Sequence, residues 1–198
     1  MGEMMLERRA AIETLLAERP DDLFVVPGLG STTYDVASLG ESDRDFHLWG
    51  AMGGAAMIGL GLALAQPRLR VAVITGDGEM LMGLGSLATI GVQQPKNLAV
   101  IVFDNAHYGE TGMQASHTGG GVDLIGVAKA CGIADSLAVT DETGLKQLAA
   151  RLPRFDRPLF ATVRIRPEEP PRVLPTRDGV AIKLRFRKAV AASAGATQ

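Results

Sequence analysis

Short, continuous apolar runs alternate along this chain with longer segments of helical spacing. Residues 70–75 are the clearest run, because they are apolar or β-branched on both faces, as in a strand buried inside a sheet. Comparable runs predict further strands at residues 23–26, 46–49, 98–103, 137–139 and 159–165. The pattern therefore predicts six strands.

Helices are predicted in the segments between these strands, from apolar spacing and from capping residues such as Ser31. They cover residues 6–19, 31–39, 53–66, 80–92, 123–131 and 142–152. Continuous apolar strands separated by helices are typical of a parallel sheet with helices on both of its faces. We therefore expect an α/β fold, a single doubly wound domain with a six-stranded, mainly parallel sheet.

The character of the chain changes after Arg166. Several prolines between residues 167 and 175 predict an extended segment, a basic segment follows at residues 183–188, and the small residues 189–198 are expected to fray. We therefore predict one domain over residues 1–166, which includes the N-terminal helix, and an extended basic C-terminal arm over residues 167–198.

The composition narrows the class of protein. The 198 residues are 46% hydrophobic and carry a formal net charge of −2, so charge offers no reason to expect a nucleic-acid partner. Cys131 is the single cysteine, which rules out an intramolecular disulfide and fits a reducing compartment. The N-terminus lacks the apolar run of a secretory signal, and the Gly-rich stretch 50–66 is too short for a membrane span. We expect a cytoplasmic protein that binds neither nucleic acid nor membrane.

Glycine-rich clusters follow four of the predicted strands, at residues 28–31, 50–53, 76–78 and 105–112. Glycine lets the backbone turn tightly or approach a ligand closely. In an open parallel sheet, ligands bind beyond the carboxyl ends of the strands. The clusters are therefore expected to meet at one edge of the sheet and to form a binding site there.

Asp77 and Asn105 are the candidate metal ligands at this edge. Asp77 lies between Gly76 and Gly78 directly after a buried strand, and Asn105 lies at the end of the next one. The 26 residues between Gly78 and Asn105 accommodate a helix and a return strand, so the two side chains would meet side by side. Mg²⁺ prefers oxygen ligands and usually takes one or two side chains together with phosphate and water. A cation that bridges to a phosphate fits this pair.

The motif formed by residues 76–78 and 104–105 is similar to the signature of thiamin-diphosphate enzymes, although Asp104 stands where the signature often has asparagine. The resemblance implies a thiamin-diphosphate-binding fold of the diphosphate-binding (PP) type, with thiamin diphosphate and Mg²⁺ as cofactors. The implied Mg²⁺ ligands are Asp77, Asn105 and the backbone carbonyl oxygen of His107. The implied diphosphate contacts include the backbone N–H groups of Gly78 and Glu79.

Two further segments strengthen the resemblance. Residues 50–53 resemble the segment before the buried helix of related decarboxylases, in which the glycine carbonyl bonds the cofactor's 4′-amino group and the methionine supports the bent cofactor. The loop 105–114 resembles that of phosphonopyruvate and sulfopyruvate decarboxylases, and the likeness extends over about residues 25–165. The implied cofactor-binding residues are Gly30, Ser31, Gly50, Met52, Gly76, Asp77, Gly78, Glu79, Asn105, His107, Tyr108 and Gly109.

The sequence lacks room for one element that this chemistry requires. In the resembling family, a glutamate on a separate pyrimidine-binding domain activates the cofactor, and only 22 residues precede the first predicted strand here. The resemblance therefore implies the diphosphate-binding (beta) subunit of a 2-oxo acid decarboxylase. We expect it to be active only in a hetero-oligomer, such as α2β2 or larger, with an alpha subunit that supplies the pyrimidine-binding domain and the glutamate. A carboligase or oxidoreductase subunit with the same cofactor, and a non-catalytic cofactor-binding subunit, remain alternatives.

His117 is the candidate catalytic residue of the chain itself, because it lies in the loop that could close over a substrate and histidine transfers protons near neutral pH. Arg44 is a candidate for binding an anionic substrate tail, whereas Trp49 would favour an apolar one. Packing is the favoured role of His47. The basic residues that could reach the substrate or a neighbouring subunit are Arg185, Arg187 and Lys188.

Overall fold

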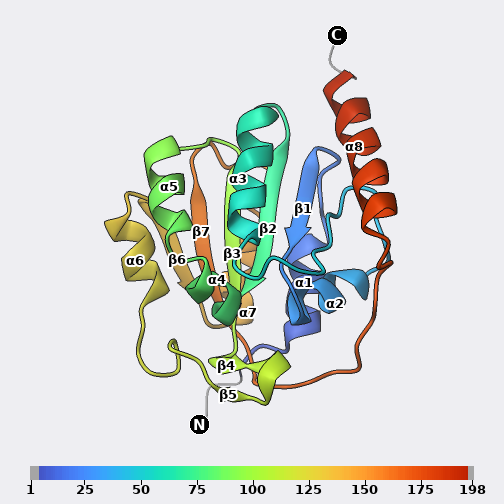
Figure 1. Cartoon of the computed structure of the whole chain (residues 1–198). Coiled ribbons are helices and arrows are strands. Elements are labelled where there is room, and N and C mark those ends of the chain that lie inside the picture. The colour runs from blue at the N-terminus through green and yellow to red at the C-terminus, as the bar shows by residue number, and fades with distance from the viewer. Residues whose placement is uncertain (1–4, 196–198) are drawn as a thin grey trace.

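A five-stranded parallel sheet forms the centre of the computed structural model, which describes residues 5–195 (Figure 1). Its strands are β1 (Leu23–Pro27), β2 (Arg70–Gly76), β3 (Leu98–Asp104), β6 (Asp135–Val139) and β7 (Leu159–Arg164). Their order across the sheet is β1-β2-β3-β7-β6, and every neighbouring pair is parallel. The strands β1, β2, β3 and β7 are buried along most of their length, which explains their continuous apolar sequence.

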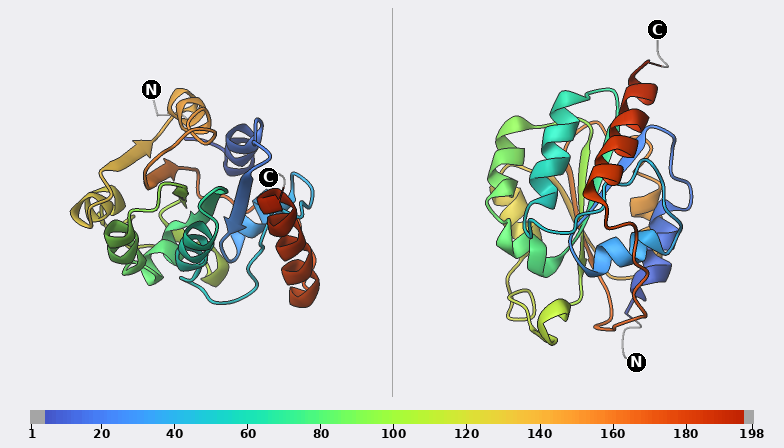
Figure 2. Two further views of the ribbon diagram at one scale, coloured as in Figure 1. Left: turned by 90° about the horizontal axis from the view of Figure 1, so that it is seen from above. Right: turned by 45° about the vertical axis from the view of Figure 1, so that its right-hand side comes forward.

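Helices cover both faces of the sheet, which confirms the predicted α/β class. One face packs against α1 (Arg8–Leu16), α2 (Ser31–Ala37) and α7 (Glu142–Ala149). The other face packs against α3 (Ala55–Ala65), α4 (Asp77–Met82), α5 (Ser86–Gln93) and α6 (Leu124–Ala130). Seen from above, the sheet lies between these two helical layers (Figure 2).

The prediction of a sixth strand at residues 46–49 is wrong. This segment makes one parallel bridge to the sheet, between Asp45 and Val25, and then leaves it. Its aromatic side chain Phe46 packs instead against Phe186, with ring centroids 5.1 Å apart. An apolar run alone does not distinguish a strand from a segment that packs beneath a helix. Here the segment is buried by the C-terminal helix that carries Phe186, and not by pairing in the sheet.

The single helix predicted over residues 80–92 is also wrong, because the chain forms α4 and α5 with a break between them. The break contains Gly83, where a Cβ atom would lie 2.2 Å from the carbonyl oxygen of Gly53. Only glycine permits this approach of two backbones. The break therefore brings the 50–54 loop against the end of α4.

The C-terminal region differs from the expected extended arm. Residues 166–178 are extended, but α8 (Gly179–Gly195) is a helix of 17 residues, so residues 189–195 do not fray. The fraying expected of residues 196–198 lies outside the described residues. Phe186 packs edge-on against Phe24 of β1, with ring centroids 5.4 Å apart. This contact holds α8 beside the β1 edge of the sheet (Figure 1).

The carboxyl ends of the strands point to the end of the molecule that carries a small ribbon (Figure 1). The ribbon consists of β4 (His107–Tyr108) and β5 (Gln114–Ala115), paired antiparallel and joined through the 3₁₀ helix η1 (Gly109–Thr111). Three of the four glycine-rich clusters of the sequence, at residues 28–31, 76–78 and 105–112, follow strand ends on this side, whereas residues 50–53 follow no strand. Within residues 5–195, no helix has the length and apolar character needed to cross a membrane.

Candidate functional site

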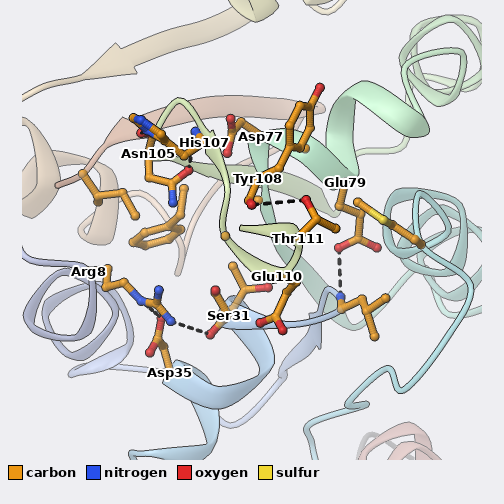
Figure 3. Close-up of a pocket in the computed structure, with 18 residues that line it drawn as sticks. Arg8, Ser31, Asp35, Asp77, Glu79, Asn105, His107, Tyr108, Glu110 and Thr111 are labelled. Atoms are coloured by element: carbon orange, nitrogen blue, oxygen red, sulfur yellow. Dashed lines mark hydrogen bonds and ion pairs between the residues drawn. The ribbon is translucent and has the colours of Figure 1, made fainter. Parts of the chain in front are cut away.

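A cavity opens at the carboxyl edge of the sheet, between the β2–α4 turn and the loop after β3 (Figure 3). Its empty space, which includes open solvent, is about 780 Å³. The lining residues are Arg8, Leu29, Ser31, Thr32, Asp35, Met52, Gly76, Asp77, Gly78, Glu79, Phe103, Asn105, His107, Tyr108, Gly109, Glu110, Thr111 and Ile165.

Asp77 is the first residue of α4 and is 2% exposed. The hydroxyl group of Ser116 donates a hydrogen bond to its Oδ2 atom, and the Thr118 hydroxyl lies 3.1 Å from the same atom. Burial raises the pKa of the Asp77 carboxyl, although these hydroxyl contacts oppose the change. No ion pair joins Asp77 to a basic side chain within residues 5–195. The site thus holds a buried, oriented carboxylate that no basic side chain of residues 5–195 neutralises.

Asn105 and His107 form a tight turn on the same side of the cavity as Asp77 (Figure 3). The side-chain oxygen of Asn105 accepts a hydrogen bond from the His107 backbone N–H at 2.9 Å, and His107 Nδ1 lies 2.8 Å from the Asn105 carbonyl oxygen. Ala106 between them has a positive φ of 60°, which an ordinary residue adopts at a cost. The turn gathers amide and carbonyl oxygens near one carboxylate. Such a set suits a hard cation.

Glu79 connects two of the turns around the cavity. Its Oε2 atom accepts hydrogen bonds from the backbone N–H of Leu29 at 2.9 Å and from the hydroxyl of Thr75 at 2.8 Å. The side chain is 4% exposed, and burial raises its pKa. A Cβ atom at Gly28 would lie 1.8 Å from Oε2, so glycine is required where the β1–α2 turn meets this carboxyl. Glu79 therefore fixes the β1–α2 turn with its side chain, a contact that the sequence did not indicate.

His117 does not line the cavity, contrary to the expectation for a residue that acts on a substrate directly. Its ring is exposed, and its Nδ1 atom shares a hydrogen bond with the hydroxyl group of Tyr108. The ring of Tyr108 lies close to Gly78, where a Cβ atom would be 2.8 Å from the ring. His117 thus contacts the site through Tyr108.

Most of the residues expected at the cofactor line this one cavity, and Gly30 and Gly50 are the exceptions among them. The remaining candidates lie elsewhere. Arg44 bonds the carbonyl oxygen of Pro20 and pairs with Asp21 at the opposite end of β1, so it is not in the cavity. Trp49 donates to the carbonyl oxygen of Thr176. On α8, Arg185 pairs with Glu41, and Arg187 and Lys188 are exposed.

Arg8 and Asp35 are site residues that sequence reasoning missed. The Arg8 Nε atom donates to Asp35 Oδ2 at 2.6 Å, both side chains are nearly fully buried, and both line the cavity. The two residues lie on different helices, and no local pattern predicts their contact. The sequence also did not predict the contacts of Ser116 and Thr118 with Asp77, although these residues flank His117, which was a candidate because its ring can transfer protons.

Comparison with known proteins identifies a family and relatives for this chain. The C-terminal TPP-binding domain of thiamine pyrophosphate enzymes matches residues 29–163. Phosphonopyruvate decarboxylase from Streptomyces viridochromogenes is 43% identical over 160 residues, which are 81% of this chain and 40% of that one. Sulfopyruvate decarboxylase subunit beta from Methanothermobacter thermautotrophicus is 40% identical over 164 residues, 83% of this chain and 84% of that one.

The fold has solved counterparts. Benzoylformate decarboxylase from Polynucleobacter necessarius superposes with a TM-score of 0.68 at 23% identity, over 85% of this chain and 34% of that one. This likeness concerns the fold alone. The chain thus spans about two fifths of the phosphonopyruvate decarboxylase that it matches, and most of the sulfopyruvate decarboxylase beta subunit.

Proposed function

Because the chain belongs to the thiamine pyrophosphate enzymes and corresponds to their C-terminal TPP-binding domain, we propose that it is the diphosphate- and Mg²⁺-binding subunit of a heteromeric 2-oxo acid decarboxylase. Phosphonopyruvate and sulfopyruvate, named by its relatives, are the proposed substrate class. The single observation that carries the proposal is Asp77, a buried carboxylate without a basic side-chain partner in residues 5–195, which shares a cavity with Asn105 and His107.

Mg²⁺ would be bound by the Asp77 carboxylate, the Asn105 side-chain oxygen and the His107 carbonyl oxygen. The fit rests on the chemistry of the donors, since these are hard oxygen ligands with one negative charge. Within residues 5–195, no cluster of three or more His, Cys, Asp or Glu side chains forms a metal site of another kind. Ser116 and Thr118 would hold the carboxylate in position while phosphate oxygens and water complete the coordination.

The cofactor, when bound, supplies a ring that accepts the electrons released as CO₂ leaves the 2-oxo acid. The chain's own residues orient and enclose it. Backbone N–H groups of Gly78 and Glu79 would face the diphosphate, and Ser31 would contact its far end. Met52 lines the cavity and is 44% exposed, so its flexible thioether side chain is available to support the cofactor from below.

A partner chain is proposed to cover the outer face of α3, α4 and α5. No side chain of α3 is polar, and a helix that is apolar all round normally lies in a protein interior. Nevertheless, Met57 and Leu64 of α3 are 44% and 49% exposed. Met82 of α4 and Val92 of α5, on two helices that cover the same face of the sheet as α3, are 65% and 80% exposed. We call these four residues the apolar face.

The proposed occupant is the pyrimidine-binding subunit that carries the activating glutamate. Two observations support this choice over a second copy of the chain. The exposed Met52 lines the cavity, and a Cβ atom on the next residue, Gly53, would lie 3.1 Å from Met82 Cγ, so the apolar face approaches the cavity here. In addition, the Methanothermobacter relative is a sulfopyruvate decarboxylase subunit beta, a name that implies a partner subunit of another kind.

Cofactor binding tests the metal site. Trp49 is the only tryptophan and lies next to the Met52 loop, so its fluorescence should change when thiamin diphosphate and Mg²⁺ are titrated into the chain. Asp77→Ala should abolish the Mg²⁺-dependent part of binding. Asp156→Ala, which removes an exposed carboxylate far from the cavity, should leave it unchanged. Unaltered Mg²⁺-dependent binding in Asp77→Ala would contradict the assignment.

Assembly tests the partner. The chain should be copurified with the candidate pyrimidine-binding subunit, and the pair should be assayed on a panel of 2-oxo acids. Leu64→Asp should prevent assembly and activity, whereas Val180→Asp, on the exposed side of α8, should permit both. An active complex formed by Leu64→Asp would exclude the apolar face as the docking surface, and carboligation without net decarboxylation would replace the proposed reaction.

A further inference from the structure

Residues 166–178, which we call the C-terminal strap, run along the carboxyl edge of the sheet from β7 to α8 (Figures 1 and 2). The match to the family ends at residue 163, so the strap lies outside the shared domain. The backbone N–H of Arg166 donates to the carbonyl oxygen of Leu6 at 2.9 Å, which directs the chain towards α1. The strap therefore begins just after the segment that the family model matches.

The first part of the strap binds the buried arginine of the cavity wall. Arg8 donates from its guanidinium to the carbonyl oxygen of Glu168 at 3.1 Å, and its backbone N–H donates to the Glu168 carboxylate at 3.2 Å. Arg9 donates to the carbonyl oxygen of Pro171. These contacts bring the strap beside the cavity, where residues 168–172 line a neighbouring pocket together with Arg8, Ser31 and Asn105.

The middle of the strap binds the loop that carries the proposed metal ligands. Arg172 pairs with Glu110 at 3.1 Å, and its guanidinium lies 5.5 Å from the centre of the Tyr34 ring. Glu110 belongs to η1, directly after the β4 residues His107 and Tyr108, and it lines the cavity. Arg172 thus ties the loop after β3 to α2.

The end of the strap binds the loop on the other side of the cavity. The indole N–H of Trp49 donates to the carbonyl oxygen of Thr176 at 2.8 Å, and the guanidinium of Arg177 lies 5.2 Å from the Trp49 ring centre. The Thr176 backbone N–H in turn donates to Glu41 at 2.8 Å. Trp49 directly precedes the segment that contains Met52.

We infer that the strap is a clamp that positions the Trp49–Met52 loop and the His107–Thr111 loop for the cofactor, with Arg172 and Trp49 as its positioning residues. The inference rests on the proposed function, because it assumes that the cavity binds thiamin diphosphate. Ordering a free loop at the moment of binding costs conformational entropy, and contacts that order it beforehand reduce this cost. The ribbon β4–β5 pairs only two residues on each side, so it holds the His107–Thr111 loop weakly by itself.

The test is the affinity of the full chain for Mg²⁺–thiamin diphosphate, measured by calorimetry. Arg172→Ala should weaken binding about threefold to tenfold, the range expected for an exposed ion pair together with a cation–π contact. Trp49→Phe keeps the ring but loses the N–H, and should weaken binding as well. Arg172→Lys, which keeps the charge, should restore part of the affinity. Arg157→Ala, which breaks the exposed pair with Asp156, is the matched control and should have no effect.

Thermal unfolding distinguishes positioning from simple stabilisation. If the strap only stabilised the fold, Arg172→Ala and Trp49→Phe would lower the melting temperature and leave the cofactor Kd within twofold of the wild type, and this result would overturn the inference. If the wild type failed to bind the cofactor at all, the proposed function would fail first, and the inference with it. Binding that is lost in Asp77→Ala but unaltered in Arg172→Ala and Trp49→Phe would reject the clamp alone.

Discussion

Protonation of His47 should destabilise this protein in mildly acidic solution. The side chain is 2% exposed, and neither of its ring nitrogens has a hydrogen-bond partner within residues 5–195. The pKa of His47 is lowered from 6.5 to about 4, mainly by burial and further by the charges of Arg185 and Arg19, while Glu41 opposes the change. The protein therefore holds this histidine neutral beneath α8.

The size of the effect follows from the two pKa values. An unfolded chain binds a proton on His47 as the pH falls through about 6.5, whereas the folded protein does so only near pH 4. Between these values the unfolded state holds more protons, so the free energy of unfolding falls as the pH falls. The full loss is about 3 kcal/mol, and about 2 kcal/mol of it should be lost between pH 8 and pH 5.

Urea unfolding at pH 8 and pH 5 measures this loss. Because other groups titrate in the same range, the comparison is between the wild type and His47→Leu, in which their contributions cancel. His47→Leu should lose about 2 kcal/mol less than the wild type over this interval. Equal pH dependence in the wild type and His47→Leu would refute the reasoning.

Two further predictions concern the elements that surround the cavity. Gly59→Ala should destabilise the fold by about 1–3 kcal/mol, because its Cβ atom would lie 2.2 Å from Val73 Cγ2. In the same helix, a Cβ atom at Gly61 meets nothing within 4 Å, so Gly61→Ala should stabilise the lone chain by up to about 1 kcal/mol. Chemical unfolding of both variants measures these changes, and similar free energies of unfolding for the two would contradict the prediction. Glu79→Ala should lower the free energy of unfolding by roughly 2–3 kcal/mol because Leu29 N–H and Thr75 lose their acceptor, and Glu79→Gln should lose less than half of that amount. Equal losses in thermal unfolding of Glu79→Ala and Glu79→Gln would show that the acceptor oxygen is unimportant.

The parts of the molecule that the sequence predicted are those determined by local pattern. Residues 70–75 and 98–103 are buried strands because they are continuously apolar, and the rule that parallel strands end at one edge predicted that Asp77 and Asn105 would share a cavity. The sixth strand failed because residues 46–49 pack beneath α8, a helix that the basic sequence 183–188 did not indicate. The apolar pattern of a segment predicts that its side chains are buried, but it does not predict which helix or strand covers them.

The contacts that complete the site could not be predicted, since they join residues remote in sequence. Arg8 meets Asp35 across 27 positions, and Ser116 meets Asp77 across 39. The strap is the extreme case, because Trp49 and Thr176 are 127 positions apart. No spacing rule relates such pairs. They arise only when the sheet has placed the loops together.

The carboxylates around the cavity explain why a cation would bind at Asp77. Asp35 is paired with Arg8, Asp104 lies 3.2 Å from Arg164, and Glu110 lies 3.1 Å from Arg172. Glu79 has no basic partner, but one of its oxygens already accepts hydrogen bonds from Leu29 and Thr75. Asp77 receives only hydroxyl contacts, which orient a carboxylate without neutralising it. A divalent cation would lower the pKa that burial raises, because it favours the charged form. We therefore propose Asp77, which no basic side chain of the described residues neutralises, as the carboxylate ligand of the cation.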